Sequence, residues 1–222
     1  MNASETLINT SLHRVIEVKH LTRQAYRLRV ERGSLQFKAG QCVNVGLPGA
    51  GVNREYSTYS GEKDPFLDML IKEVEGGIVS VALKARNPGD SVEIHGAYGD
   101  FRLKTPGDGR PYLFIGSGTG IAPFRSFVRT YPKLDYKILH GVRHTEERYD
   151  REDYDPARYV ACVSREDGGD FRGRVTDYLR RNPADKKSVC YLCGNRAMIV
   201  EVYGLLREQG VPSDNLFTEV FF

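Results

Sequence analysis

The chain has 222 residues, of which 40% are hydrophobic and 27% are charged, and its formal net charge is +3. These values are ordinary for a globular protein, and the charge shows none of the concentrated basic stripes of a nucleic-acid-binding protein. No apolar run is as long as a membrane span, and the opening MNASETLINTSLHR lacks the apolar centre of a signal peptide. The four cysteines are not spaced like a disulfide framework, so we expect a reducing, cytoplasmic compartment.

From residue 12 to about residue 101, the apolar runs are short and rich in β-branched residues. Strands are predicted for HRVIEVKHL, AYRLRVE, QCVNVGL, FLDMLIKEV and SVEIHG, and Gly, Pro and Asp separate them. The segment GIVSVALKAR, between two of these strands, is consistent with one helix. Many short strands with close turns favour a small antiparallel barrel or sandwich.

The segment KTPGDGRP, residues 104–111, is the best candidate linker, because the pattern changes after it. Beyond it, predicted strands in PYLFIGSG, DYKILHGV, RYVACVSRE, SVCYLCG and NLFTEVFF alternate with predicted helices in APFRSFVRTY, GRVTDYLRRN and RAMIVEVYGLLREQG. Such alternation predicts a parallel sheet with helices on both faces. We therefore predict an all-β antiparallel barrel domain over residues 1–105, followed by an α/β domain over residues 111–222.

A glycine loop, IGSGTGIAPF, follows the first strand of the predicted α/β domain. Glycines 116, 118 and 120 would let the backbone approach a phosphate closely, and the N-terminus of the next helix favours negative charge. The usual dinucleotide fingerprint needs a glycine where Ile121 stands and an acidic residue near the end of the second strand, where this chain has basic Arg143. A plain strand-to-helix turn is the alternative interpretation.

Four motifs in this order resemble the ferredoxin–NADP reductase family of FAD-dependent, NAD(P)H-linked flavoprotein reductases. They are R-x-Y-S-x-x-S at 54–60, GGIVS at 76–80, GTGIAPFRSF at 118–127 and CGNRAM at 193–198, and the ending EVFF is similar to the family's Glu-Val-Tyr. The resemblance covers essentially the whole chain. It implies that the first domain binds FAD, that the second binds a nicotinamide dinucleotide, and that the last strand returns to the flavin.

The resemblance implies roles for the cluster NREYSTYS, residues 53–60. Arg54 would pair with the flavin phosphate, Tyr56 would lie against one face of the isoalloxazine, and Ser57 would bond near N5. Strand alternation places Arg54 and Tyr56 on one face and Ser57 on the other, so we expect a bulge or sharp turn at Tyr56–Ser57, whereas Ser60 is expected to be structural. The alternative is an exposed, polar edge strand.

The turn at residues 76–80 favours FAD over FMN, because its N–H groups and a hydroxyl could hold a second phosphate. The further cofactor-binding candidates of the first domain are Lys72, Gly77, Val79 and Ser80.

The second cofactor is expected to be NADP, with NAD as the alternative. The resemblance places the 2′-phosphate at Ser164 and Arg165, and an arginine suits the charge that NAD lacks. Arg174 lies just beyond, and Arg143 would reach the pyrophosphate; a solvated basic loop is the plainer interpretation of these residues. The loop candidates are Gly118, Thr119 and Gly120.

Cys190 and Cys193 form a C-x-x-C pair that is expected to be neither a redox dithiol nor half of a metal site. Residues three apart on a strand point to opposite faces, and no second pair exists. Cys190 is predicted to be buried, and the resemblance places Cys193 near the nicotinamide. If Glu219 points into the site, alternation puts Phe221 on the same side, so Phe221 rather than Phe222 is expected to cover the flavin, although both are cofactor-binding candidates.

The catalytic candidates are therefore Ser57, Cys193, Glu219 and Phe221. No cysteine cluster has the spacing of an iron–sulfur site, so the electron acceptor is expected to be a separate molecule. The leading hypothesis is a reductase between NADPH and a one-electron carrier such as ferredoxin or flavodoxin. The alternatives are a reductase that feeds an oxygenase or free flavin, and a flavin-binding electron-transfer subunit of a larger complex.

Overall fold

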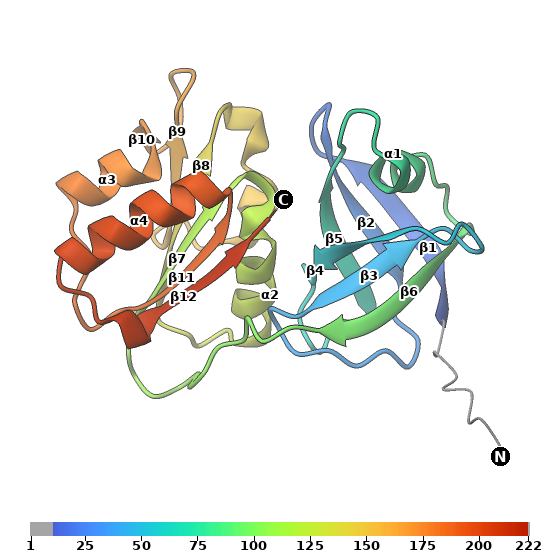
Figure 1. Cartoon of the computed structure of the whole chain (residues 1–222), viewed down its shortest axis with the longest axis horizontal. Coiled ribbons are helices and arrows are strands. Elements are labelled where there is room, and N and C mark those ends of the chain that lie inside the picture. Colours follow the sequence, from blue (N-terminus) through green and yellow to red (C-terminus); the bar gives the residue numbers. More distant parts are fainter. Residues whose placement is uncertain (1–10, 222) are drawn as a thin grey trace, which may run out of the picture.

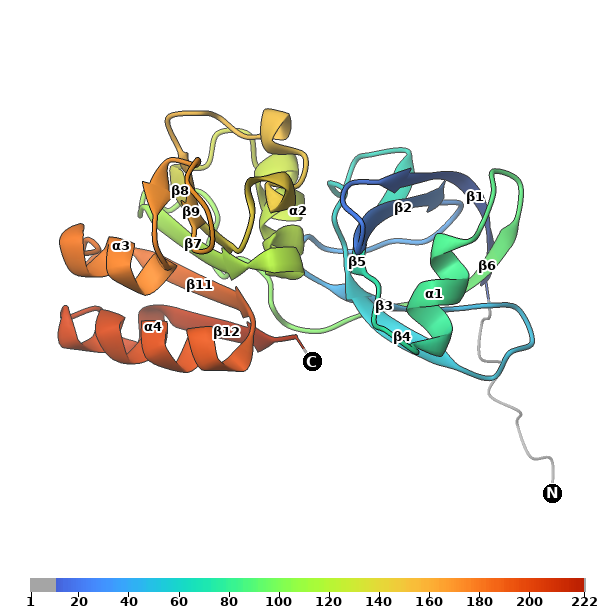
Figure 2. The ribbon, with the colours of Figure 1, turned by 90° about the horizontal axis from the view of Figure 1, so that it is seen from above.

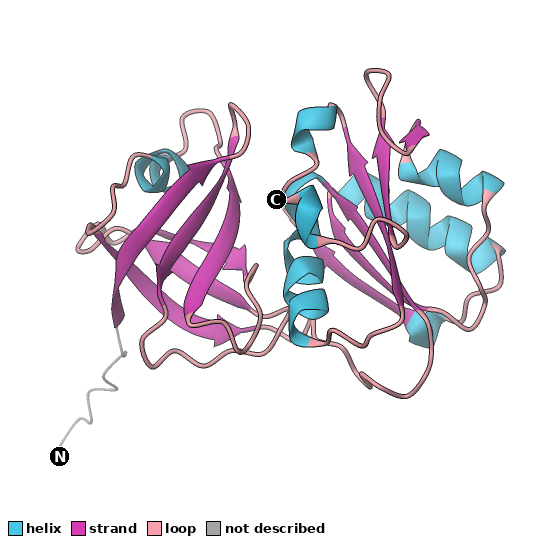
Figure 3. Cartoon of the chain, turned by 180° about the vertical axis from the view of Figure 1, so that it is seen from behind, coloured by secondary structure: helices cyan, strands magenta, loops and turns pink. Residues whose placement is uncertain are grey.

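The computed structural model describes residues 11–221 and contains two six-stranded sheets (Figure 1). The first sheet is antiparallel and has the order β4-β3-β6-β1-β2-β5. Its strands are β1 (Ser11–His20), β2 (Ala25–Glu31), β3 (Cys42–Gly46), β4 (Asn53–Ser57), β5 (Phe66–Lys72) and β6 (Ser91–Tyr98). The sheet curls so that its edges approach each other (Figure 3), and an isolated bridge joins Thr58, which follows β4, to Met69 in the middle of β5. The predicted antiparallel β domain is confirmed, but no continuous ladder closes the described strands into a barrel.

The inner face of the first sheet forms its own hydrophobic core. Alternate residues of β2 and β5 are fully buried there, as expected for strands with one face toward a core. The predicted helix is α1 (Ile78–Lys84), and it packs Val79 and Leu83 into this core. Tyr56 of β4 packs against the same cluster, so the edge strand and α1 share one core.

The second sheet is parallel and has the order β10-β9-β8-β7-β11-β12. Its strands are β7 (Tyr112–Ser117), β8 (Tyr136–Val142), β9 (Tyr159–Val163), β10 (Phe171–Arg172), β11 (Val189–Gly194) and β12 (Leu216–Val220). The helix α2 (Ala122–Thr130) covers one face, and α3 (Val175–Arg181) and α4 (Arg196–Glu208) cover the other (Figure 2). Burial of nearly every residue of β7 and β11 is typical of strands covered on both faces, and the predicted α/β pattern is confirmed.

Short 3-10 turns complete the α/β part. They are η1 (Gly118–Ile121), η2 (Thr145–Glu147), η3 (Arg151–Asp153) and η4 (Ser213–Asn215).

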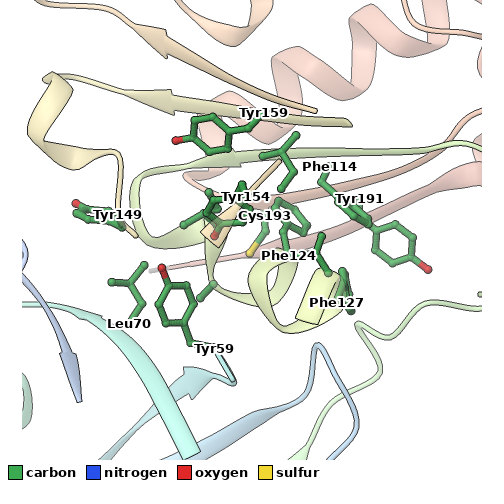
Figure 4. Close-up of a cluster of buried hydrophobic side chains, with 14 of the residues drawn as sticks. Tyr59, Leu70, Phe114, Phe124, Phe127, Tyr149, Tyr154, Tyr159, Tyr191 and Cys193 are labelled. Atoms are coloured by element: carbon green, nitrogen blue, oxygen red, sulfur yellow. The ribbon is translucent and has the colours of Figure 1, made fainter. Parts of the chain in front are cut away.

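The helix α2 lies between the two sheets and is buried almost all round. Its Phe124 and Phe127 belong to an aromatic core that includes Phe114 and Tyr191 of the second sheet (Figure 4). Tyr59, which follows β4 in the chain, belongs to the same cluster. One apolar core therefore runs from the first sheet to the second, and it fixes the position of one against the other.

Buried ion pairs also join the two parts. Arg125 of α2 is 2% exposed, donates to the backbone oxygen of Tyr59 at 2.9 Å, and pairs with Asp68 of β5 at 3.5 Å and with Asp153. Arg27 of β2 pairs with Asp150 of the β8–β9 connection at 3.2 Å. Removing one partner of such a pair would leave an uncompensated buried charge, so these contacts constrain the relative orientation of the two sheets.

Candidate active site between the two sheets

The ends of three strands bring Ser57, Cys193 and Glu219 together. Ser57 is the last residue of β4, and its hydroxyl donates to Oε2 of Glu219 at 3.2 Å. Cys193 and Glu219 are paired residues of the parallel strands β11 and β12, so their side chains share a face, and Sγ of Cys193 lies 3.8 Å from the same Oε2. Two of the predicted catalytic residues, Ser57 and Cys193, therefore both contact a third, Glu219.

Burial controls the protonation of this cluster. It raises the pKa of Glu219 to about 7, although the bonds from Ser57 and Cys193 act in the opposite direction. It also raises the pKa of the Cys193 thiol well above its usual range, and the neighbouring Glu219 adds to that shift. The thiol is therefore protonated at neutral pH, whereas the Glu219 carboxyl can either hold or release a proton.

Cys190 has no part in this cluster. It packs in the core on the opposite face of the second sheet from Cys193, as expected for residues three apart on a strand. Both thiols are free, and residues 11–221 contain no group of three or more His, Cys, Asp and Glu side chains that could hold a metal ion.

The expected bulge at Tyr56–Ser57 is wrong. The β3–β4 ladder is regular, with Val43 opposite Tyr56 and Cys42 opposite Ser57. Side chains alternate between the two faces of β4 up to its last residue. Tyr56 packs on the first core, while Ser57 faces the second sheet. Ser60 is structural, as expected, since its hydroxyl accepts from the Asp68 N–H at 3.0 Å.

The surface around Arg54 and the start of α1 has the character of a cofactor site. The Arg54 side chain is exposed and forms no ion pair within the described chain; its Nη1 donates to the Asn53 backbone oxygen at 2.7 Å. At the start of α1, Ile78 is 70% exposed, and the preceding Val74 is 59% exposed. An exposed guanidinium without an ion-pair partner suits a phosphate, and exposed apolar side chains suit a flat apolar ring; FAD carries both groups.

The predicted phosphate turn uses its side chains internally. The Ser80 hydroxyl is buried and accepts from the Val74 N–H at 3.0 Å, and Val79 is a core residue. A Cβ on Gly77 would lie 2.8 Å from the Val74 backbone oxygen, so this position requires glycine. Only the backbone N–H groups of the first helical turn are left to meet an anion there.

A cavity of about 520 Å³ opens at the carboxyl edge of the parallel sheet. Parallel strands present their carboxyl ends at one edge, which is where open α/β sheets bind ligands. Lys72, the last residue of β5, extends the cavity to the first sheet, and Phe221 lies at the same boundary. The predicted candidates that line it are Lys72, Gly118, Thr119, Arg143, Ser164, Arg165, Arg174 and Phe221.

Sequence reasoning missed several lining residues. They are Ser117, Glu147, Thr176, Asn195, Met198 and Glu201; Ser117 ends β7 and Asn195 directly follows β11. The strand-end rule applied to every predicted strand would have suggested Ser117 and Asn195. Thr176 and Glu201 lie within helices that carry no comparable signal.

Gly120 packs against protein rather than lining the cavity. A Cβ there would lie 2.3 Å from the backbone oxygen of Cys193, and a Cβ on Gly194 would lie 2.5 Å from the Ser117 hydroxyl oxygen. These glycines let the β7–α2 turn and the end of β11 come into contact. Within the glycine motif, Gly120 is therefore required for packing, whereas Gly118 lines the cavity.

Two hydrogen bonds to backbone oxygens hold the ends of β8 and β9 together, where two of the basic residues lie. The Ser164 hydroxyl donates to the Val142 backbone oxygen at 3.1 Å, and the Arg165 N–H donates to the Arg143 backbone oxygen at 3.0 Å. The ends of β8 and β9 thus place Arg143 and Arg165 side by side at the cavity.

Phe221 lies on the boundary between the two sheets. Its N–H donates to the Gly194 backbone oxygen at 2.9 Å, and its half-buried ring packs against the shared aromatic core. Phe222 lies outside the described residues.

Comparisons with known proteins bear directly on this arrangement. Residues 10–103 match the family model described as "Oxidoreductase FAD-binding domain", and residues 114–203 match "Oxidoreductase NAD-binding domain". Ferredoxin–NADP reductase B of Sorangium cellulosum is 31% identical over 234 residues, which cover 93% of this chain and 95% of that protein. The chain belongs to the ferredoxin–NADP reductase family. Its two matched regions correspond to the FAD-binding and the NAD-binding domain of oxidoreductases.

Other similar members of this family are parts of oxygenase systems. The reductase subunit of an Amycolatopsis aromatic O-demethylase is 32% identical over 204 residues, and the electron transfer component of Pseudomonas putida toluate 1,2-dioxygenase is 31% identical over 224 residues. These matches cover 83% and 93% of this chain, which spans 61% and 66% of the lengths of the two relatives.

Solved structures show the same fold. The Amycolatopsis cytochrome P450 reductase GcoB has a TM-score of 0.84 and 30% identity, with 96% of this chain and 71% of that chain covered. A ferredoxin NADP+ reductase from Neisseria gonorrhoeae, with bound FAD and NADP, has a TM-score of 0.85 and 23% identity, with 96% and 99% covered. Within residues 11–221, no helix is long and apolar enough to cross a membrane.

Proposed function

We propose that this protein is an NADPH-dependent reductase that passes electrons singly to a ferredoxin- or flavodoxin-like carrier protein. We assign FAD to residues 1–105 and NADPH to residues 111–222. The proposed FAD contacts are Arg54, Tyr56, Ser57, Gly77, Val79 and Ser80, with the last two contributing backbone N–H groups only. The proposed NADPH contacts are Lys72, Gly118, Thr119, Arg143, Ser164, Arg165 and Arg174.

The observation that carries the preference for NADPH is the charge balance of the cavity. The guanidiniums of Arg143, Arg165 and Arg174 line it, and none of them forms an ion pair within residues 11–221. The two carboxylates of the lining already have partners. Glu147 accepts the backbone N–H groups of Arg143 and His144, at 2.6 and 3.1 Å, and Glu201 pairs with Arg180 at 2.9 Å.

Such a cavity favours an anionic ligand over a neutral one. Unpaired arginines suit phosphate because the guanidinium offers a planar set of donors. The 2′-phosphate of NADPH supplies charge that NADH lacks. Ser164 and Arg165 lie at the end of β9, where side chains can contact a substituent on the ribose. This supports NADPH as the preferred donor.

The Ser57–Glu219 pair has a separate role in the proposal. When bound, FAD would accept a hydride from the nicotinamide and release electrons singly. Glu219 can hold or release a proton near neutral pH, and the Ser57 hydroxyl at the end of β4 donates to it. We assign these two residues to proton exchange at the reacting face, Cys193 to packing beside it as a neutral thiol, and Phe221 to covering that face.

A second candidate function is a reductase component of an oxygenase system, in which the acceptor is an iron–sulfur or haem protein. The observation in its favour is the similarity to the O-demethylase and dioxygenase components. Both candidates use the same two cofactors and differ in the acceptor.

The test couples the purified protein to ferredoxin and follows cytochrome c reduction with NADPH and with NADH. We expect reduction that depends on ferredoxin and is faster with NADPH. Rapid use of NADPH without any ferredoxin dependence would favour the oxygenase or free-flavin role. Bound flavin that neither dinucleotide reduces would contradict independent turnover and leave only an electron-transfer subunit.

A further inference from the structure

The imidazole of His140 is completely buried beside the dinucleotide cavity, and the proposed chemistry does not use it. His140 lies on β8 and is 0% exposed. Its Nδ1 lies 2.7 Å from the hydroxyl of Tyr159 on β9, and its Nε2 lies 2.8 Å from the backbone oxygen of Gly118. It therefore connects the centre of the sheet to the first residue of η1.

The partners fix the tautomer of the ring. The Gly118 oxygen is a carbonyl and can only accept, so Nε2 must carry a hydrogen. Burial lowers the pKa of His140 to about 4, so the ring is neutral near pH 7 and its Nδ1 has a lone pair. The Tyr159 hydroxyl then donates to Nδ1 and anchors the ring, while the Gly118 carbonyl selects the Nε2–H form.

The bond to Gly118 orients the peptide that faces the cavity. A trans peptide is planar, so the N–H of Thr119 points away from the Gly118 carbonyl and hence away from His140. Gly118 has a positive φ of 53°, which glycine adopts readily, so the ring holds a flexible peptide in one orientation. Gly118 and Thr119 line the cavity, whereas His140 does not.

We propose that His140 is a positioning residue for dinucleotide binding: Tyr159 anchors its ring through Nδ1, and its Nε2–H fixes the Gly118 carbonyl and so presents the Thr119 N–H to an anionic group of the dinucleotide. The inference rests on the proposed function, because it requires a dinucleotide in this cavity. His140 would influence dinucleotide binding only through the Gly118–Thr119 peptide and would not contact the dinucleotide itself.

Tyr159→Phe is the sharpest test, since it removes only the hydroxyl that anchors the ring at Nδ1. Tyr149→Phe is the matched control, because Tyr149 is also buried against His140, with ring centroids 6.0 Å apart, but forms no hydrogen bond with it. The readouts are the ¹⁵N spectrum of the histidine rings near pH 7, assigned with His140→Gln, and the Kd values for NADP+ and NAD+ by calorimetry.

The wild-type protein should show the Nε2–H form of His140. Tyr159→Phe should keep this form but lose the hydrogen bond at Nδ1, which moves the ¹⁵N resonance of that nitrogen, and should bind the preferred dinucleotide roughly three- to tenfold more weakly, while Tyr149→Phe matches the wild type. A wild-type Nδ1–H form would overturn the inference without any variant. Unchanged affinity in a Tyr159→Phe protein whose Nδ1 resonance has moved would also overturn it. A wild-type protein that binds neither NADP+ nor NAD+ would instead contradict the proposed function.

Discussion

The Ser57 hydroxyl lies 3.2 Å from the Glu219 carboxylate, although 162 positions separate them in the chain. One residue ends an edge strand of the antiparallel sheet, and the other lies on the last strand of the parallel sheet. The contact therefore exists only when the two sheets are packed together as they are here. It places a carboxyl with a pKa of about 7 where the two cofactor domains meet.

The first prediction concerns the stability contributed by Glu219. Burial raises its pKa from 4.5 to about 7, so the folded state holds this proton more tightly than the unfolded state. The resulting stability is fully present below about pH 4.5 and is lost as the pH rises through 7, an effect of about 1–3 kcal/mol. Glu219→Gln should flatten the dependence of Tm on pH between 5 and 8, measured by calorimetry. Glu208→Gln, at an exposed position of α4, is the control; an equal flattening there would contradict the assignment.

The second prediction concerns flavin retention. Arg54→Ala removes the exposed guanidinium proposed to pair with the FAD phosphate, and a lost charge-assisted bond should weaken FAD binding roughly 10- to 100-fold. The ratio of flavin to protein absorbance after gel filtration measures the loss. Arg14→Ala changes an exposed arginine of β1 and should leave the flavin bound. Full flavin content in Arg54→Ala would exclude this residue as the phosphate partner.

The third prediction concerns the choice of dinucleotide. Arg165→Ala should weaken NADPH binding by about tenfold or more and leave NADH nearly unaffected, because only NADPH has the phosphate for this arginine. Steady-state kcat/KM for both donors measures the change. Arg172→Ala is a matched control, since that guanidinium is exposed, pairs with Asp167 at 2.8 Å and lies outside the cavity lining. If both donors weakened equally, Arg165 would not be the discriminating residue.

The fourth prediction concerns the aromatic ring at the cavity boundary. Phe221 lines the cavity and packs on the shared core, so in the proposal it competes with the nicotinamide for the flavin face. Phe221→Ser should bind NADP+ more tightly, by roughly tenfold, and turn over more slowly because product release is delayed. A long-wavelength absorbance band on titration with NADP+ reports the stacked pair. Phe222→Ser is the comparison, and a band in that variant alone would show that the wrong phenylalanine was chosen.

The fold could be predicted because burial leaves a periodic signal in the sequence. The runs that became β7 and β11 are nearly continuous apolar segments, and α4 carries Ile199, Val202 and Leu206 on one buried face. The short strand β10, Phe171–Arg172, was missed because two residues give no periodicity.

Site residues that belong to a sequence motif could be predicted. Contacts that depend on how the two sheets pack together could not. The resemblance named Ser57, Cys193 and Glu219, but their mutual contact depends on how the two sheets meet. The same holds for Arg125, which lies within the predicted glycine-loop motif and turns out to pair with Asp68 across the interface. The packing role of Gly120 against Cys193 likewise arises from two strand ends that are distant in sequence.

The central claim is that this flavoprotein takes hydride from NADPH in preference to NADH through the basic cavity. Anaerobic stopped-flow mixing of the purified yellow protein with each donor, followed by the loss of flavin absorbance, tests it most directly. We predict that both donors reduce the flavin and that NADPH does so with at least tenfold greater efficiency at low concentration, an advantage that added salt diminishes. Equal efficiency of the two donors, or a preference for NADH, would contradict the claim.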